Sequence, residues 1–164
     1  EMKDKNHKIF VRDIMTKNVV SLSPETPIAE AARVIAERNL DGAPVVDNSG
    51  KLLGILTEYD LISKESLIHL PTFQAVMKNL NFDKNSGAEI SEDLKKISEM
   101  KVKDVMNMDP FIFHDDTDFE AVVEAFRVHH RVNPIPGVTK DNKVIGVVSR
   151  YDVLVPLQKV AAFR

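Results

Sequence analysis

The sequence contains no cysteine, which excludes disulfide frameworks, thiolate metal sites and cysteine nucleophiles. It also lacks an excess of charge of one sign: the net charge of its 164 residues is −3 and both signs are scattered along the chain. Strong electrostatic attraction to nucleic acid or to an anionic membrane is therefore not expected. No apolar run approaches the roughly 18 residues of a membrane-spanning helix, and no signal-peptide pattern opens the chain. We expect a cytoplasmic protein without nucleic-acid or membrane partners.

Motifs for catalysis and metal binding are missing as well. The sequence has no Gly-x-x-x-x-Gly-Lys loop, no nucleophile elbow and no His-Glu-x-x-His motif. His129 and His130 are adjacent, and neighbouring residues on a helix point about 100° apart, so this pair favours a helix end over a metal site. We expect no enzymatic activity, no metal and no required cofactor.

What the sequence does contain is an internal repeat. Val11-Arg12-Asp13-Ile14-Met15 aligns with Val102-Lys103-Asp104-Val105-Met106 at an offset of 91 residues. After the helix that follows, the second copy gains one residue, so that Gly54 aligns with Gly146 at an offset of 92. Repetition of this length indicates two copies of one structural unit.

A helix is predicted near the start of each copy. Thr26 is the expected N-cap of the first helix and is followed by Pro27, which suits the first helical position. Thr117 is the expected N-cap of the second, with Glu120 completing a capping box. Apolar residues recur at helical spacing in both segments: Ile28, Ala31, Ala32 and Ile35 in the first, and Phe119, Val122, Val123 and Phe126 in the second.

The remaining segments of each copy predict strands and a final helix. Short apolar runs at residues 19–22 and 111–113 predict a strand before the helix. Two hairpins are predicted after it, with strands around residues 45–46 and 52–56, and around 138 and 144–148. A last helix begins near Glu58 or Arg150. Because neither copy is large enough to bury its own sheet face, we predict an α+β fold of two pseudo-symmetric β-α-β-β-α repeats packed sheet against sheet.

This pattern divides the chain into four parts. Residues 1–8 form a polar N-terminal segment, 9–67 the first repeat, 68–100 an insert and 101–160 the second repeat. Phe73, Val76, Met77 and Leu80 predict an amphipathic helix in the insert, 81–89 a loop, and Ser91 the cap of a short helix carrying Leu94 and Ile97. The insert is either a packed connector or a ligand lid or partner-binding arm.

The same glycine-to-aspartate signature closes each repeat, at residues 54–60 and 146–152. A strand ends at Thr57 or Ser149, and Asp60 or Asp152 follows three residues later. This spacing is close to that of a capping box. The same groups can also hold a nucleotide, because a helix N-terminus and a hydroxyl suit a phosphate and a carboxylate accepts two hydrogen bonds from a ribose diol. The spacing does not separate these two interpretations.

With these motifs in place, the chain resembles a tandem pair of CBS domains, a Bateman module. The motifs that carry the resemblance are the Asp-Ile-Met and Asp-Val-Met segments, residues 42–47, residues 130–133 before Ile135-Pro136, and both signatures. Members of the family bind adenine nucleotides or S-adenosylmethionine, and some have no known ligand. The resemblance implies two clefts, each built from the hydroxyl and ribose-binding aspartate of one repeat and the adenine-facing loop of the other.

Carried over by position, the resemblance assigns residues to each cleft. The favoured cleft uses Ser149, Arg150, Asp152, Thr16, Val20, Leu40, Asp41 and Ala43, and the second uses Thr57, Glu58, Asp60, Met108, Phe111, Arg131, Val132, Asn133 and Ile135. Arg150 offers a phosphate partner in the favoured cleft, although Asp41 works against it, whereas Glu58 would repel a polyphosphate in the second. Phe111 is placed to pack on an adenine ring. Pro134, Gly137 and Thr139 depart from the family pattern in the second cleft.

Two functions follow from the resemblance and remain open. The first is a regulatory sensor that binds AMP, ADP, ATP or another adenosyl ligand such as S-adenosylmethionine between the repeats and acts on a protein not identified by the sequence. The second is a structural homodimerisation or partner-interaction module without a ligand, in which the signatures are helix caps. A homodimer is expected in both cases.

Overall fold

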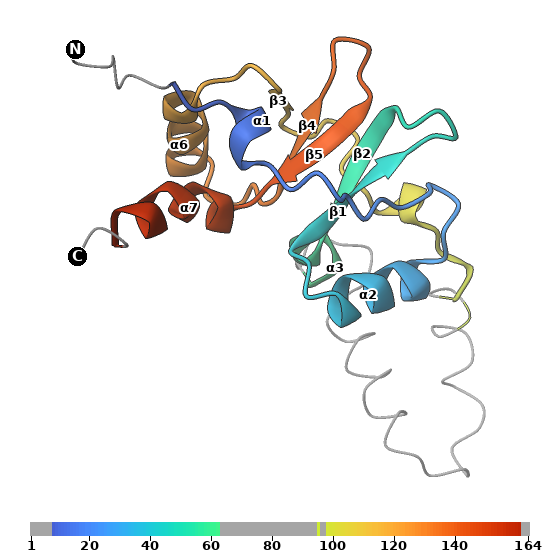
Figure 1. The fold of residues 1–164 in the computed structure, drawn as a ribbon. Helices are drawn as coiled ribbons and strands as arrows, with labels where there is room; N and C mark the ends of the chain where they lie inside the picture. The colour runs from blue at the N-terminus through green and yellow to red at the C-terminus, as the bar shows by residue number, and fades with distance from the viewer. Residues whose placement is uncertain (1–7, 63–94, 96–97, 162–164) are drawn as a thin grey trace, which may run out of the picture.

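The structure is a computed structural model that describes residues 8–62, 95 and 98–161 (Figure 1). The amphipathic helix and the loop predicted in the insert lie outside the described residues, as do Ser91, Leu94 and Ile97 of the predicted short helix. In chain order the elements are α1 (Val11–Ile14), α2 (Ile28–Glu37), β1 (Gly42–Val46), β2 (Leu52–Thr57), α3 (Glu58–Ile62), the 3₁₀ helix η1 (Val102–Asp104), β3 (Phe113–His114), α6 (Phe119–Val128), β4 (Ile135–Val138), β5 (Val144–Val148) and α7 (Arg150–Ala161). Among these, no helix is long and apolar enough to cross a membrane.

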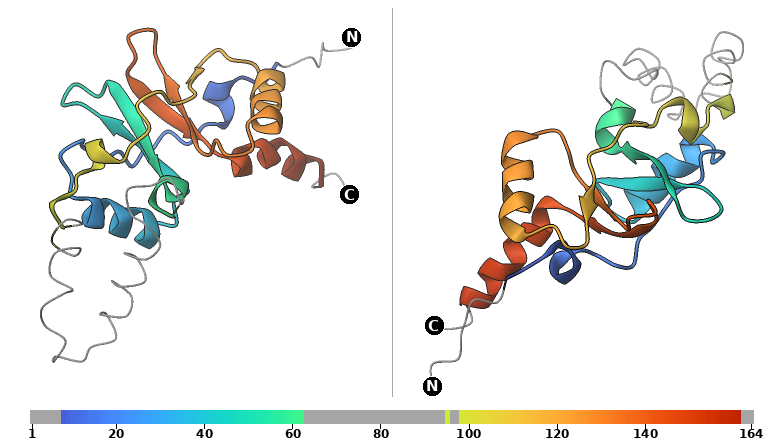
Figure 2. Two further views of the ribbon diagram at one scale, coloured as in Figure 1. Left: turned by 180° about the vertical axis from the view of Figure 1, so that it is seen from behind. Right: turned by 90° about the horizontal axis from the view of Figure 1, so that it is seen from above.

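Both predicted hairpins are confirmed. β1 pairs with β2 and β4 with β5, each antiparallel, and β3 adds to β4 in parallel. Gly50 takes a φ of 82° in the first turn, a conformation that a glycine adopts without steric cost. The predicted α+β fold of two pseudo-symmetric repeats is therefore correct, with the two hairpins side by side and α2 and α3 on one flank, α6 and α7 on the other (Figures 1 and 2).

The strands predicted before each helix are shorter than expected. Residues 19–22 form no strand, and only Leu22 bridges to Val45 of β1. The chain turns away at once, since the amide of Thr26 donates to the carbonyl of Ser23 across a turn that contains Pro24, which has no N–H for a ladder. In the second repeat β3 covers Phe113 and His114 instead of the predicted residues 111–113.

The predicted caps of α2 and α6 are wrong by one residue. Pro27, which has no side-chain donor or acceptor, is the N-cap of α2 in place of Thr26. Asp118 caps α6 in place of Thr117, and its Oδ1 accepts the amide of Ala121 at 2.9 Å. Thr117 instead accepts the amide of His114, which closes the turn before the helix.

The apolar faces predicted for α2 and α6 are buried or half-buried with one exception. Val123 on α6 is exposed, and Ala125 takes its place in the core. The difference arises because α6 packs mainly through Val122, Ala125 and Phe126, a narrower stripe than the predicted one.

The first segments of the two repeats are exchanged between the two cores. Val11 of α1 is fully buried among second-repeat residues that include Phe113 and Val148. Val102 of η1 is fully buried among first-repeat residues, with Leu56 beside it in the core. Each repeat therefore completes its core with a segment from the other, which holds the two together through apolar burial.

Backbone bridges continue this exchange. The Thr16 amide donates to the Val147 carbonyl at 2.9 Å, and the Val147 amide donates back to the Thr16 carbonyl at 3.0 Å. Asn107 and Ile55 form the same pair of backbone hydrogen bonds, both at 2.9 Å. Thr16 and Asn107 hold equivalent positions in the repeats, as do Ile55 and Val147, so the two bridges are pseudo-symmetric. They place the residues after α1 and η1 against the strands that lead into the signatures.

Candidate functional site

Both signatures form the same local structure. β2 ends at Thr57 and α3 begins at Glu58. The carboxylate Oδ2 of Asp60 accepts the Thr57 amide and the Thr57 hydroxyl, each at 2.8 Å, and the Asp60 amide donates back to the hydroxyl at 3.3 Å. Thr57 is buried and Asp60 half-buried, so these hydrogen bonds are partly shielded from solvent.

The second signature repeats these contacts. The Oδ2 of Asp152 accepts the Ser149 amide at 2.7 Å and the Ser149 hydroxyl at 3.1 Å. The capping contacts are thus formed in both repeats. In each case these hydrogen bonds end on Oδ2. The other carboxylate oxygen, Oδ1, is a second acceptor that a ligand hydroxyl can use.

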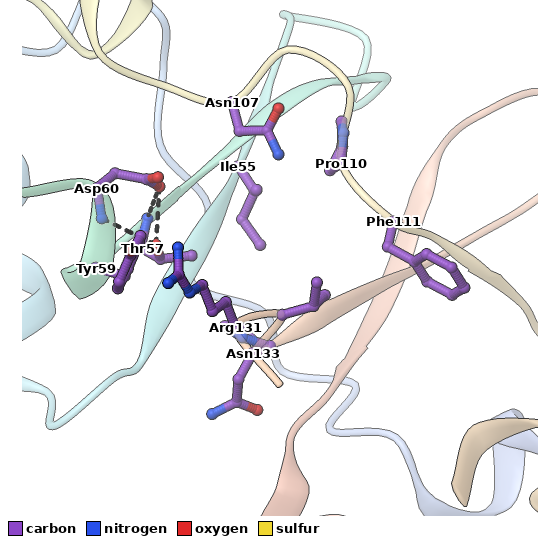
Figure 3. A pocket seen from close by; sticks show the side chains of 11 residues that line it. Ile55, Thr57, Tyr59, Asp60, Asn107, Pro110, Phe111, Arg131 and Asn133 are labelled. Carbon is purple, nitrogen blue, oxygen red and sulfur yellow. Dashed lines mark hydrogen bonds between the residues drawn. The ribbon is translucent and has the colours of Figure 1, made fainter. Parts of the chain in front are cut away.

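A cavity of about 230 Å³ opens beside Asp60. Its lining combines the first signature with the loops after η1 and before β4: Ile55, Thr57, Tyr59, Asp60, Asn107, Pro110, Phe111, Arg131, Val132, Asn133 and Pro134. We call this the Asp60 cavity. Figure 3 shows Thr57, Tyr59 and Asp60 together at one end and Phe111 apart from them. Both repeats contribute, as the resemblance implied.

The walls of the Asp60 cavity combine aromatic rings with charges of both signs. Arg131 lies over the Tyr59 ring, with Cζ 5.4 Å from the ring centroid. Phe111 contacts His129 and Phe113, with ring centroids 4.9 and 5.7 Å away. An exposed guanidinium, a carboxylate and a partly exposed aromatic ring can bind an anion, a diol and a flat heterocycle.

Most residues assigned to the second cleft meet in this cavity. Six of them line it: Thr57, Asp60, Phe111, Arg131, Val132 and Asn133. Three do not: Met108 is 74% exposed, Ile135 is fully buried in the core, and Glu58 lies on a different cavity.

Five lining residues were not predicted, namely Ile55, Tyr59, Asn107, Pro110 and Pro134. Asn107 is the equivalent of Thr16, which the prediction placed in the favoured cleft, so the repeat alignment contains the signal for it. Pro134 follows a cis peptide bond after Asn133.

Arg150, the expected phosphate partner, makes other contacts. Its guanidinium donates to the carbonyls of Phe126, His129 and His130 at 2.9, 3.0 and 2.9 Å. It also lies over the Phe126 ring, 5.1 Å from the centroid. A cation that binds the free carbonyls at a helix C-terminus caps the helix, so in this structure Arg150 joins α7 to the end of α6.

The other residues assigned to the favoured cleft lie in several places. Thr16 is bridged to Val147 and Ala43 is buried in the first core. Leu40 and Asp41 line an open cavity of about 430 Å³ between α2 and α3, together with Glu58. Val20 is half-buried. The side chains of Asp41 and Asn133, assigned to different clefts, are joined by a 2.8 Å hydrogen bond.

His129 ends α6, and its amide donates to the carbonyl of Ala125. Within the described part of the chain, no three His, Asp or Glu side chains gather in a way that would hold a metal ion.

Comparison with known proteins identifies the repeats. The CBS domain family matches residues 11–66 and 102–158. A CBS domain-containing protein of Dictyostelium discoideum is 30% identical over 155 residues, which cover 93% of this chain and 94% of that protein. The chloroplastic CBS domain-containing protein CBSX2 of Arabidopsis thaliana is 26% identical over 160 residues, covering 92% of this chain and 64% of that protein.

Solved structures share the fold. That of CBSX2 in complex with AMP superposes with a TM-score of 0.68 at 23% identity, covering 93% of this chain and 98% of that one. The CBS domain pair of protein MJ0100, in complex with 5′-methylthioadenosine and S-adenosylmethionine, gives a TM-score of 0.63 at 21% identity and covers 91% of this chain and 99% of that one. The chain spans only 22% of an inosine-5′-monophosphate dehydrogenase of Methanocaldococcus jannaschii, with which it shares 29% identity over 142 residues covering 87% of this chain.

Proposed function

The chain belongs to the CBS-domain family as a tandem pair, and from this premise we propose that it is a non-catalytic regulatory module that binds an adenosyl ligand in the Asp60 cavity. The observation that carries the proposal is the cavity itself, whose lining includes Asp60 and Arg131 and, apart from them, Phe111 (Figure 3). In this arrangement Asp60 accepts the ribose hydroxyls, Arg131 pairs with a phosphate and Phe111 packs on the base.

The size and charge of the cavity favour a mononucleotide. At about 230 Å³ it is smaller than the roughly 300–1,000 Å³ of most drug-sized ligand sites. One exposed cation, Arg131, lies on its wall, which suits one phosphate group better than the longer chain of ATP. AMP is present in the structure of the similar CBSX2, which supports the same choice. S-adenosylmethionine remains the competing adenosyl ligand, because MJ0100 was solved with it.

We place the ligand in the Asp60 cavity, although the comparison of Arg150 with Glu58 in the sequence ranked the favoured cleft, which contains Asp152, first. Two observations support the Asp60 cavity. Arg150 is engaged with three carbonyl oxygens of α6 and its following residues. Glu58, the expected source of repulsion, does not line the Asp60 cavity.

The alternative is a homodimerisation module without a ligand. It is favoured by the signatures, whose capping contacts are formed by protein groups, and by exposed apolar residues on α7: Tyr151 is 77% and Leu157 64% exposed. A homodimer is compatible with both functions, and the regulated protein is a further partner in the first.

Thermal unfolding with AMP, ATP and S-adenosylmethionine separates the two functions. A ligand at about 100 times its Kd stabilises the folded state by about 2.7 kcal/mol. We expect AMP to raise the midpoint of the wild type and of Asp152→Ala, and to have no effect on Asp60→Ala. The two variants are matched because each loses the same kind of cap. If no adenosyl compound raises the midpoint, the ligand-free alternative stands; if binding is lost only in Asp152→Ala, the ligand occupies the other cleft.

A further inference from the structure

Asn133 connects the two repeats through both ends of its side chain. Its Nδ2 donates to Oδ2 of Asp41, the residue at the equivalent position of the first repeat, at 2.8 Å. Its Oδ1 accepts the backbone amide of Arg150, the first residue of α7, at 3.1 Å. One amide group therefore ties the first repeat to the beginning of the last helix of the second.

The same side chain lies at the edge of the Asp60 cavity. Asn133 lines that cavity (Figure 3), as do its neighbours Val132 and Pro134. Its partner Asp41 lines the open cavity between α2 and α3. Asn133 thus lines the cavity, while its two side-chain hydrogen bonds reach Asp41 and the Arg150 amide, residues that do not line it.

The first repeat does not reproduce this connection. Glu58, the equivalent of Arg150, donates its amide to the backbone carbonyl of Asp41 at 3.0 Å, not to a side chain. A backbone carbonyl moves only with the chain, but the carboxamide of Asn133 turns about its own side-chain torsions. The first amide of α7 thus depends on a rotatable group, and the first amide of α3 does not.

We propose that Asn133 is a positioning residue that transmits occupancy of the Asp60 cavity to the first turn of α7. A bound ligand restrains the Asn133 side chain, which keeps the Arg150 amide bonded and orders the start of α7. Arg150 extends this effect, because its guanidinium holds the carbonyls at the end of α6. The ligand-dependent step rests on the proposed function, and the tie between Asn133 and Arg150 does not.

Amide hydrogen exchange measured by NMR tests the tie in the free protein. In Asn133→Ala we expect the Arg150 amide to exchange at least about tenfold faster than in the wild type, because its acceptor is gone. The Glu58 amide is the internal control and keeps its wild-type rate. Asn133→Asp retains the acceptor for Arg150 but repels Asp41, and the additional change Asp41→Asn restores the bond between the repeats. If Arg150 exchanges at the wild-type rate in Asn133→Ala, the tie is overturned.

The same measurement with AMP tests the transmission. AMP is expected to slow exchange of the Arg150 amide in the wild type and to leave it unchanged in Asn133→Ala, when each protein is saturated with AMP at a concentration set by its own thermal-unfolding titration. If AMP slows exchange equally in both, Asn133 does not transmit occupancy. If AMP fails to bind the wild type, the proposed function and the transmission fail together, and the free-protein comparison shows separately whether the tie exists.

Discussion

The α-carbon of Gly54 lies so close to Asn107 that a Cβ built on the glycine would be 2.6 Å from the Asn107 carbonyl oxygen. Gly54 opens the first signature, and Asn107 follows η1 of the other repeat. Its backbone is bridged to Ile55, next to Gly54, in both directions. The glycine is therefore needed for close approach of two backbone segments, one from each repeat.

Substitution of the two signature glycines should have unequal effects. Gly54→Ala places a methyl group against the carbonyl oxygen of Asn107, whose backbone is held by two hydrogen bonds to Ile55, and we expect it to lower the free energy of unfolding by about 2–3 kcal/mol. Gly146→Ala places the Cβ mainly against the Met15 side chain, with Sδ at 2.4 Å, and a flexible thioether can move. We expect about 1 kcal/mol there. Urea unfolding measures both, and an equal or reversed order would contradict this explanation.

Part of the fold around these two glycines could be predicted from the sequence. The alignment of Gly54 with Gly146 is part of the repeat that was predicted, and short β-rich runs joined by turn residues predicted both hairpins correctly. The sequence pattern indicates that Val11 and Val102 are apolar, but it does not indicate which core each of them enters. The exchange of these segments between the repeats was therefore not predicted.

The candidate site was predicted in part for a similar reason. The resemblance to CBS pairs assigned Thr57, Asp60 and Asn133 to one cleft, and all three line the Asp60 cavity; the repeat alignment would have added Asn107. The contacts of Arg150 could not be predicted, because the carbonyl groups that it binds become available only where α6 ends, 20 to 24 residues away along the chain. Local spacing carries no information on such a partner.

The two signature aspartates should contribute equally to the stability of the ligand-free protein. Asp60→Ala and Asp152→Ala each remove an Oδ2 that accepts one amide and one hydroxyl hydrogen. We expect each to lower the free energy of unfolding by about 0.5–2 kcal/mol, as for other helix caps. Urea unfolding without ligand checks this, and a large difference between them would show that the two caps are not equivalent.

Arg150 should act on the stability of the second repeat. Arg150→Ala removes three hydrogen bonds from a cation to the carbonyls at the end of α6, and we expect a loss of about 1–3 kcal/mol. Arg150→Lys should recover part of this loss, since an ammonium reaches fewer of the three acceptors. Urea unfolding gives the free energies. If Arg150→Ala retains full stability but loses affinity for AMP, the residue is a ligand contact and not a cap.

Arg131 should discriminate AMP from adenosine. If it pairs with the phosphate, Arg131→Met weakens AMP binding by about fivefold to tenfold, the effect of one partly exposed charged contact, and changes adenosine binding little. Arg12→Met is the matched control, because Arg12 also stacks on a ring, Phe10, away from the cavity. Calorimetric titration measures the four affinities. An equal loss for both ligands would mean that Arg131 acts through Tyr59 and the cavity wall.

Glu25 should make stability depend on pH in the acid range. Its carboxylate accepts hydrogen bonds from Lys101 at 2.5 Å and Lys103 at 2.7 Å, and these lower its pKa from 4.5 to about 2. A carboxyl group whose pKa is lower in the folded state stabilises that state above its unfolded pKa, and this contribution disappears as the pH falls through the folded pKa.

The difference in urea midpoint between the wild type and Glu25→Gln should therefore be largest above about pH 5, narrow between about pH 4.5 and 2, and shrink at high salt, because the three side chains are exposed. The control is the double variant Lys101→Ala with Lys103→Ala, in which Glu25→Gln should have little effect at any pH. A difference that stays constant from pH 7 to pH 2 would show that Glu25 stabilises the protein through contacts other than these two ion pairs.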